Sequence, residues 1–235
     1  DSIDAVGTVK ARESVVISAK QSERVAAVRF ESGQRVAKGQ VLIELDAGTV
    51  KAELAEARAT LADLEAQVTR LQSLQSRQLI AQSQLDTAVA ARNGARARVQ
   101  AASERLNDRI IRAPFSGVLG LRQVSQGQYV NAGFAMVNLD DLERMWVDFP
   151  VPESLLSKLK TGMSLNLKAD AFPDRTFTAS VASIDTRVDL ATRAVMVRAG
   201  IENSDGLVRP GMLMRVSLQQ DAVNALVVPE LALQQ

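Results

Sequence analysis

The sequence predicts an elongated, modular α+β protein: an antiparallel α-helical coiled-coil hairpin inserted in a small β-sandwich, followed by a small antiparallel β-barrel. Three observations carry this prediction. Residues 47–107 are rich in strong helix formers and contain a seven-residue apolar repeat. Two segments on either side of them repeat each other, and residues 141–222 contain closely spaced strand patterns divided by turn residues.

The central segment has the pattern of two paired helices. Residues 73–83 form a connection that is too short to fold on its own. We therefore predict that the helical segments on either side pair antiparallel, as a hairpin over 47–109. A core helix pair of a larger bundle is the alternative, but such helices usually have a wider apolar stripe. Apolar residues recur in steps of three and four, with Arg92 as the one polar member, at Ala47, Val50, Leu54, Ala57, Leu61, Leu64, Val68 and Leu71, and then at Leu85, Ala88, Arg92, Ala95, Val99, Ala102 and Leu106.

The flanks of the helical segment repeat each other at a constant offset of 94 residues. Residues 33–46 (GQRVAKGQVLIELD) match residues 127–140 (GQYVNAGFAMVNLD), with Gly, Gln, Val and Asp in register. We expect Gly33, Gly39, Gly127 and Gly133 to supply the positive φ of tight turns between short strands. The two halves, 28–46 and 110–140, are therefore predicted to form one β-sandwich that the hairpin interrupts.

The segment 141–222 predicts a β-barrel domain. Turn residues at 172–174, 203–206 and 209–211 separate β-type runs at 145–151, 163–169, 177–184, 194–201 and 212–218. One short helix is expected over 153–159. A strand at 5–9, within the N-terminal region 1–27, is expected to add to the barrel or to another region beside it, and residues 223–235 are expected to begin a further, truncated domain.

The composition excludes most catalytic and nucleic-acid functions. The 235 residues contain 28 Lys and Arg against 27 Asp and Glu, with no Cys and no His. The chain therefore lacks a thiol nucleophile, an imidazole base and the usual nitrogen and sulfur ligands of zinc or copper. The balanced charge also lacks the basic excess that phosphate neutralisation requires. We expect no enzyme activity, cofactor, metal or nucleic-acid partner.

Taken together, these features resemble the periplasmic adaptor (membrane fusion) proteins of bacterial tripartite efflux pumps, a HlyD-like family, particularly those that serve resistance-nodulation-division (RND) transporters. The paired Gly-Gln-x-Val segments are similar to split lipoyl/biotinyl half-motifs, with residues 112–118 opening the second half. Asp189, Thr192 and Arg193, with residues 197–199 and 210–212, resemble the adaptor barrel signature. The resemblance covers residues 28–218.

The resemblance implies a function without catalysis. The protein would lie in the periplasm and bridge an inner-membrane proton-driven transporter to a TolC-like outer-membrane channel, exporting drugs or other small toxic compounds. Copies would associate in a ring, as a hexamer or through dimers. No leader and no apolar run of 18 residues occurs in the sequence. We therefore expect an inner-membrane anchor in an N-terminal segment outside this chain, with residues 1–27 and 223–235 near the membrane-proximal region.

The resemblance also implies a docking site for the channel at the hairpin tip. The family pattern places an Arg, a Leu four positions later and a Ser eleven positions after the Arg; Arg70 and Leu74 fit, whereas position 81 is Ala. One hydroxyl is therefore missing, and Ser83 is a nearby substitute. The residues expected to dock are Arg70, Leu74, Leu79, Ile80, Ala81 and Asp86.

Other functions fit parts of the sequence. A lipoyl or biotinyl carrier needs a Lys in the turn between its half-motifs, but residues 45–48 contain none and Lys51 falls on the predicted helix. Lys38 and Gly39 stand in the wrong order for a phosphate loop. An adaptor of an ABC-type exporter or type I secretion system is the alternative that stays open, and a coiled-coil scaffold without a transport role is the second.

Overall fold

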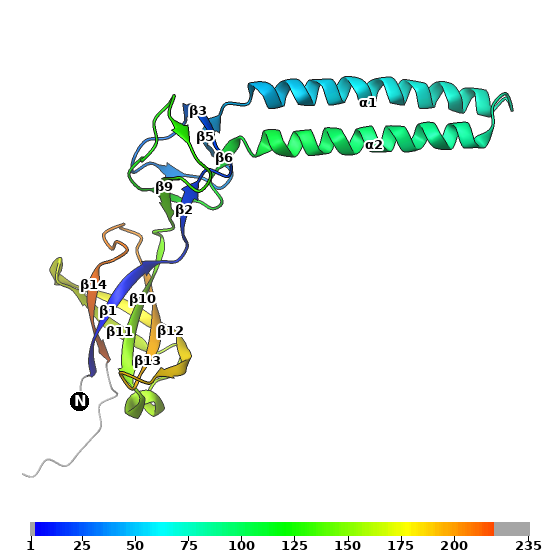
Figure 1. Cartoon of the computed structure of the whole chain (residues 1–235). Coiled ribbons are helices and arrows are strands. Elements are labelled where there is room, and N and C mark those ends of the chain that lie inside the picture. The colour runs from blue at the N-terminus through cyan, green and yellow to red at the C-terminus, as the bar shows by residue number, and fades with distance from the viewer. Residues whose placement is uncertain (1–2, 219–235) are drawn as a thin grey trace, which may run out of the picture. The chain divides into compact units, whose positions relative to one another are not determined.

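The computed structural model describes residues 3–218 (Figure 1). Its described residues divide into two compact units, Val15–Leu139 and a second unit that joins residues 3–14 to residues 140–218. The first unit holds a helical hairpin and a β-sandwich, and the second holds a closed β-barrel. The fold class predicted from the sequence is thus confirmed. The predicted start of a further domain at 223–235 lies outside the described residues.

Two long helices form the hairpin, α1 (Gly48–Gln75) and α2 (Gln82–Asn107). Every seam position predicted from the heptad pattern is buried or half-buried, including Arg92. The fully buried positions on α2 are Ala88, Ala95 and Ala102, whose small side chains allow the two helices to approach closely. The seven-residue repeat was therefore a correct guide to the helix contacts, because a two-helix contact buries only one narrow stripe on each helix.

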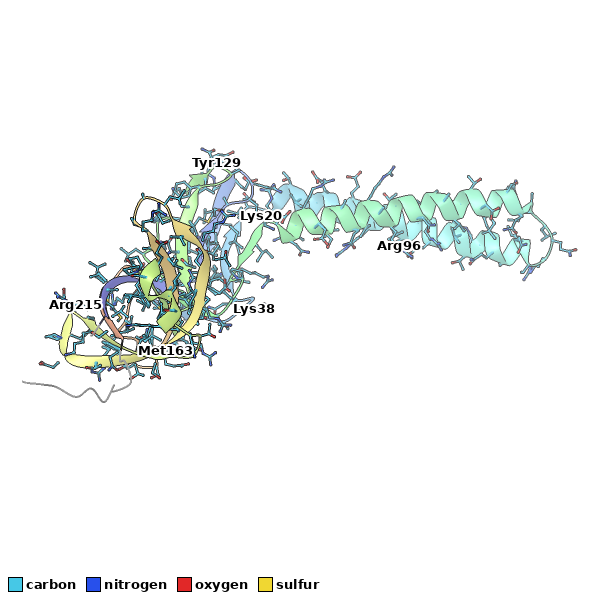
Figure 2. All side chains as sticks on the ribbon, turned by 90° about the horizontal axis from the view of Figure 1, so that it is seen from below. Lys20, Lys38, Arg96, Tyr129, Met163 and Arg215 are labelled. Carbon is cyan, nitrogen blue, oxygen red and sulfur yellow. The ribbon has the colours of Figure 1, made fainter. Side chains whose placement is uncertain are left out.

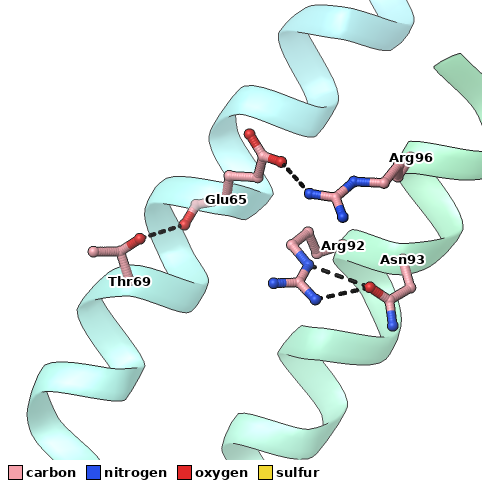
Figure 3. Close-up of polar contacts among 5 residues, drawn as sticks. All are labelled: Glu65, Thr69, Arg92, Asn93 and Arg96. Carbon is pink, nitrogen blue, oxygen red and sulfur yellow. Dashed lines mark hydrogen bonds and ion pairs between the residues drawn. The ribbon is translucent and has the colours of Figure 1, made fainter.

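Polar contacts at the edge of the seam link the two helices (Figure 3). Arg96 of α2 contacts Glu65 of α1 at 2.9 Å, and nearer the sandwich Arg105 contacts Glu53 at 3.0 Å. Arg92 donates to the side-chain oxygen of its neighbour Asn93 at 2.9 Å. The two pairs between the helices are substantially exposed, so each adds little stability. Both join residues that face each other only when the helices run antiparallel.

The β-sandwich consists of two four-stranded sheets with the orders β2-β9-β7-β4 and β6-β5-β3-β8. An offset of 94 carries β2, β3, β4 and β5 onto β6, β7, β8 and β9, so each sheet order becomes the other. The sequence repeat therefore becomes a pseudo-twofold relation between halves that exchange strands. The strands are β2 (Ser14–Ser18), β3 (Glu23–Val28), β4 (Arg35–Val36), β5 (Val41–Leu45), β6 (Ile110–Arg112), β7 (Gly117–Leu119), β8 (Tyr129–Val130) and β9 (Ala135–Asp140).

The predicted glycine turns add backbone hydrogen bonds between the two halves, beside those of the paired strands. Gly39 N–H donates to the Ala113 carbonyl at 2.8 Å, and its counterpart Gly133 donates to Ala19 at the same distance. Gly33 and Gly127 donate in the same way to Leu119 and Val25. All four glycines have φ between 79° and 83°, a conformation that disfavours residues with a Cβ. The glycines predicted from the repeat thus have the expected left-handed backbone.

The N-terminal boundary of the sandwich differs from the prediction. The sequence analysis began the sandwich at residue 28 and assigned residues 1–27 elsewhere, whereas β2 and β3 lie in the two sandwich sheets. At the offset of 94, these strands correspond to β6 and β7, but the paired positions share few residue types. The structural repeat therefore includes strands whose sequences no longer resemble each other.

The second unit is an antiparallel barrel with the strand order β1-β10-β13-β12-β11-β14. Its interior holds aliphatic and Met side chains around Phe149, which is fully buried. Two glycine turns at Gly162 and Gly211 repeat the sandwich pattern, donating to Val181 and Val9 at 2.8 Å. The strands are β1 (Ile3–Ala11), β10 (Arg144–Pro152), β11 (Ser164–Ala169), β12 (Phe172–Asp189), β13 (Ala194–Glu202) and β14 (Leu213–Leu218).

One local prediction for the barrel was wrong, and one was confirmed. Residues 172–174 were expected to form a turn but belong to β12, where Phe172 pairs with Ala169 next to a register shift. Pro is tolerated at the start of a strand beside such an irregularity. The short helix is a 3-10 helix, η1 (Glu153–Lys158).

Candidate docking site at the hairpin tip

The hairpin tip is a six-residue turn, 76–81, between the last residue of α1 and the first of α2. The Leu74 carbonyl accepts two backbone bonds, from Arg77 N–H at 3.1 Å and from Leu79 N–H at 3.0 Å. Gln78 takes the left-handed conformation with φ of 60°, which costs a residue with a Cβ roughly 1–2 kcal/mol. The turn is therefore held by its own backbone, and apart from the half-buried Ile80 its side chains are exposed.

Apolar side chains are exposed at this tip. Leu79 is 64% exposed and Leu74 is 37% exposed, while Ile80 is half-buried. Leu71 and Leu85, the nearest seam residues on each helix, are half-buried. Beyond these two seam residues, the hairpin therefore ends in Leu74 and Leu79, whose apolar side chains are partly or largely exposed.

A chain of amides closes the two helices at the tip. Gln75 Nε2 donates to Gln82 Oε1 at 3.1 Å, and Gln82 Nε2 donates to Asp86 Oδ1 at 2.9 Å. The Asp86 carboxylate is therefore partly engaged within the hairpin. Asp86 was among the predicted docking residues, whereas Gln75 and Gln82 were not. Both glutamines lie within residues 73–83, the segment that separates the two heptad series.

Two arginines at the tip are exposed and have no side-chain hydrogen bond or ion pair with any residue in the described range 3–218. They are Arg70, on the last turns of α1, and Arg77, in the turn itself. Arg77 was not among the predicted docking residues. The sequence feature that could have indicated Arg77 is its position in the polar segment between the two heptad series. The tip thus combines exposed leucines with two uncommitted guanidinium groups.

Ala81 occupies the N-cap of α2, with extended backbone (φ −71°, ψ 145°) and no side-chain cap. A Ser at an N-cap accepts a hydrogen bond from an unpaired N–H of the first turn. The Ser that the family pattern places here would therefore have a capping position available, apart from any role in docking. Ser83, the expected substitute, lies inside the first turn of α2 and cannot act as its N-cap.

The barrel signature residues build a turn. Asp189 Oδ1 accepts bonds from the N–H groups of Ala191 and Thr192, each at 2.9 Å, and from the Thr192 hydroxyl. These bonds, led by that of the Thr192 N–H, lower the pKa of the Asp189 carboxyl. Arg193 follows with φ of 53°. The three signature residues thus form the turn itself, Asp189 and Thr192 through their hydrogen bonds and Arg193 through its left-handed backbone.

Within residues 3–218, no group of three or more His, Cys, Asp or Glu side chains is placed to hold a metal ion. Neither α1 nor α2 has the length and apolar character needed to cross a membrane, and they are the long helices of this range.

Comparison with known proteins decides the family. Residues 13–140 match the model described as "RND MFP, barrel-sandwich hybrid domain", and residues 144–222 match "CusB-like, beta-barrel domain". The chain belongs to the RND membrane fusion protein family. This confirms the resemblance inferred from the sequence.

Individual relatives agree with this membership. An uncharacterized protein of Haemophilus influenzae is 31% identical over 98% of this chain and 61% of its own length. Multidrug resistance protein MdtA of Pectobacterium carotovorum is 28% identical over 99% of this chain and 62% of its own length. The chain thus spans about three-fifths of the curated relatives it matches.

A solved structure shows the same fold. The MacA-MexA chimeric protein that contains the Pseudomonas aeruginosa MexA α-hairpin domain superposes with a TM-score of 0.88 at 26% identity, covering 99% of this chain and 86% of the chimera. A putative efflux transporter from Bacteroides eggerthii gives a TM-score of 0.74 at 25% identity, covering 93% of this chain and 68% of that one.

Proposed function

We propose that this protein is the periplasmic adaptor subunit of a tripartite efflux pump, bridging an inner-membrane proton-driven transporter to a TolC-like outer-membrane channel. The proposed cargo is drugs or other small toxic compounds, in line with the names of the MdtA relatives. The proposal includes an inner-membrane anchor outside this chain and association of copies in a ring. The RND description of the matched barrel-sandwich hybrid domain favours this engine over the ABC-type alternative.

The observation that carries the docking proposal is the composition of the hairpin tip. Leu79 is largely exposed and Leu74 partly exposed, and the side chains of Arg70 and Arg77 are exposed as well. Arginines are enriched among the energetically important residues of protein interfaces, and exposed leucines supply apolar surface that a partner can remove from water. The partner would supply an apolar pocket and carboxylate or carbonyl acceptors, as a ring of helical tips can.

A charge placed at the tip should separate docking from folding. We expect Leu79→Asp to reduce drug resistance to the level of a strain without the protein, because a carboxylate would enter the apolar contact. Leu121→Asp is the matched control, since Leu121 is 80% exposed on the sandwich unit, away from the tip. Minimum inhibitory concentrations report function, and circular dichroism reports folding. Wild-type resistance in a folded Leu79→Asp variant would remove the docking proposal.

A shorter hairpin distinguishes an adaptor from a plain coiled-coil scaffold. Removing residues 58–64 and 96–102 deletes one heptad from each helix and keeps the seam in phase. The tip would then lie about 10 Å nearer the sandwich, at 1.5 Å per residue. An adaptor that must span a set distance loses efflux, whereas a scaffold without a transport role keeps it. The same variant's thermal melt checks that the shortened hairpin is folded.

A further inference from the structure

A groove of about 470 Å³ lies between β2 and β6, beside the end of α2. Its volume is within the range of roughly 300–1,000 Å³ that small-molecule sites occupy. β2 and β6 are both terminal strands in their sheet orders, so each presents one edge without a strand partner. They are also the corresponding strands of the two sandwich halves. The groove therefore lies where the pseudo-twofold halves meet without pairing.

The walls of the groove are aliphatic. Val16 of β2 is 53% exposed, while Ile17 beside it and Ile111 of β6 are buried. Ile110 and Pro114 also line the groove. Isolated exposed aliphatic residues are common on proteins, but Val16 belongs to a concave surface built from both strands. An aliphatic ligand would remove this surface from water.

The polar groups of the groove carry a positive excess. Lys20 and Arg112 line it as cations and Asp108 as the one carboxylate. Lys20 Nζ contacts Asp108 Oδ1 at 2.8 Å. Arg112 Nη1 donates to the Gly39 carbonyl at 3.1 Å, and Arg112 has no ion pair with a carboxylate among the described residues. Arg112 is thus left with donors that suit an anionic oxygen pair.

We propose that this groove binds an amphipathic anion, with an aliphatic chain along Val16, Ile110 and Pro114 and a carboxylate head on Arg112 and Lys20. The mixture of apolar walls and a few polar groups is the usual composition of a small-molecule site. This inference does not rest on docking at the hairpin tip.

Occupation of the groove would act on the root of the hairpin. Figure 2 shows Lys20 where the hairpin leaves the sandwich, and its ion pair reaches Asp108, the C-cap of α2. Asn107 and Asp108 line the groove from the helix, while Val16 and Ser18 line it from β2. A ligand bound there would contact both parts and restrain the hairpin root.

The test is titration of the chain with sodium dodecanoate by isothermal calorimetry, below the concentration at which the soap forms micelles. We expect saturable binding at one site, weakened about tenfold by Arg112→Gln through loss of a charged contact. Decanoate should bind about tenfold more weakly than dodecanoate, because two methylenes are no longer buried. Dodecyltrimethylammonium has the same chain with a cationic head and should bind much more weakly.

Matched variants locate the site. Val16→Glu should abolish binding, whereas Leu121→Glu, at another exposed apolar position of the same unit, should leave the Kd unchanged. Arg122→Gln is the control for Arg112→Gln, because Arg122 is also exposed on the sandwich. Equal binding of the cationic and anionic surfactants would overturn the proposal. So would an absence of saturable binding, or a Kd unaffected by Arg112→Gln and Val16→Glu in folded protein.

Discussion

The hairpin and the two β-units hold together in different ways. The hairpin buries a single stripe, in which three residues of α1 and three alanines of α2 are fully buried. The sandwich and the barrel instead enclose continuous clusters with fully buried residues such as Leu42 and Phe149. The hairpin's outer positions are consequently free to vary, and its tip can carry side chains chosen for contact with a partner.

Equivalent truncations should give the largest contrast between the regions. Leu42→Ala removes a fully buried side chain from the sandwich core and should lower the free energy of unfolding by about 3–5 kcal/mol. Leu54→Ala in the hairpin seam should cost nearer to about 2 kcal/mol, because neighbouring water and flexible side chains can fill the gap. Urea denaturation followed by circular dichroism measures both. Equal losses would mean that the seam is packed as densely as the sandwich core.

Ion pairs should show the same contrast. Asp148 of the barrel has a side chain only 9% exposed and accepts two bonds from Arg198, at 2.7 and 2.8 Å. We expect Asp148→Asn to cost about 1.5–3 kcal/mol at neutral pH. Glu65→Gln, which breaks the exposed pair with Arg96 in the hairpin, should cost about 0.5 kcal/mol or less.

The barrel pair should also depend on pH. The hydrogen bond from Arg198, followed by that from Lys10, holds the pKa of the Asp148 carboxyl below its ordinary value. Its stabilising effect is therefore complete above the ordinary pKa of about 4 and is lost as pH falls through the lower folded value. Stability measured from pH 7 to pH 2 should show the wild type approaching Asp148→Asn in acid. A gap that stays constant with pH would contradict this assignment.

Substitution of glycine by alanine should change sign between the regions. Gly33 has φ of 79° and no atom within 4 Å of an added Cβ, so Gly33→Ala should destabilise by about 1–2 kcal/mol through backbone strain alone. Gly94 lies inside α2, also with open space, and Gly94→Ala should stabilise by about 1 kcal/mol. Thermal melts of the two variants should shift in opposite directions. A shift of the same sign in both would show that crowding or unfolded-state effects dominate.

A small effect is also expected at the tip. Ala81→Ser supplies the missing N-cap of α2 and should stabilise the hairpin by about 0.5–1 kcal/mol. Ala81→Val is the control, because valine lacks the hydroxyl and is a poor N-cap residue. A gain from Ser that valine does not reproduce would assign the hydroxyl a capping role. No gain in stability, together with altered resistance, would assign it to docking.

Much of the fold could be predicted from short-range patterns. The seam from Ala47 to Leu106 follows from heptad spacing, and the four turn glycines follow from the repeat, because both depend on positions along the chain. The start of the sandwich at β2 could not be predicted in this way, since β2 and β6 share their position in the fold and few residue types. At the tip, Arg70 and Leu74 were available from the family pattern, whereas Arg77, Gln75 and Gln82 required the geometry of the turn.

The sequence by itself determined the order of the modules, the seam residues of the helix pair and the glycines at which the strands turn. These properties depend on periodic patterns or on neighbouring residues, so they can be predicted directly from the sequence. The tertiary structure decided how the two half-repeats exchange strands, which edges they leave unpaired around the groove, and which arginines stay without a carboxylate. Each of these depends on contacts between residues about 90 positions apart, and such contacts exist only after the halves have closed on each other.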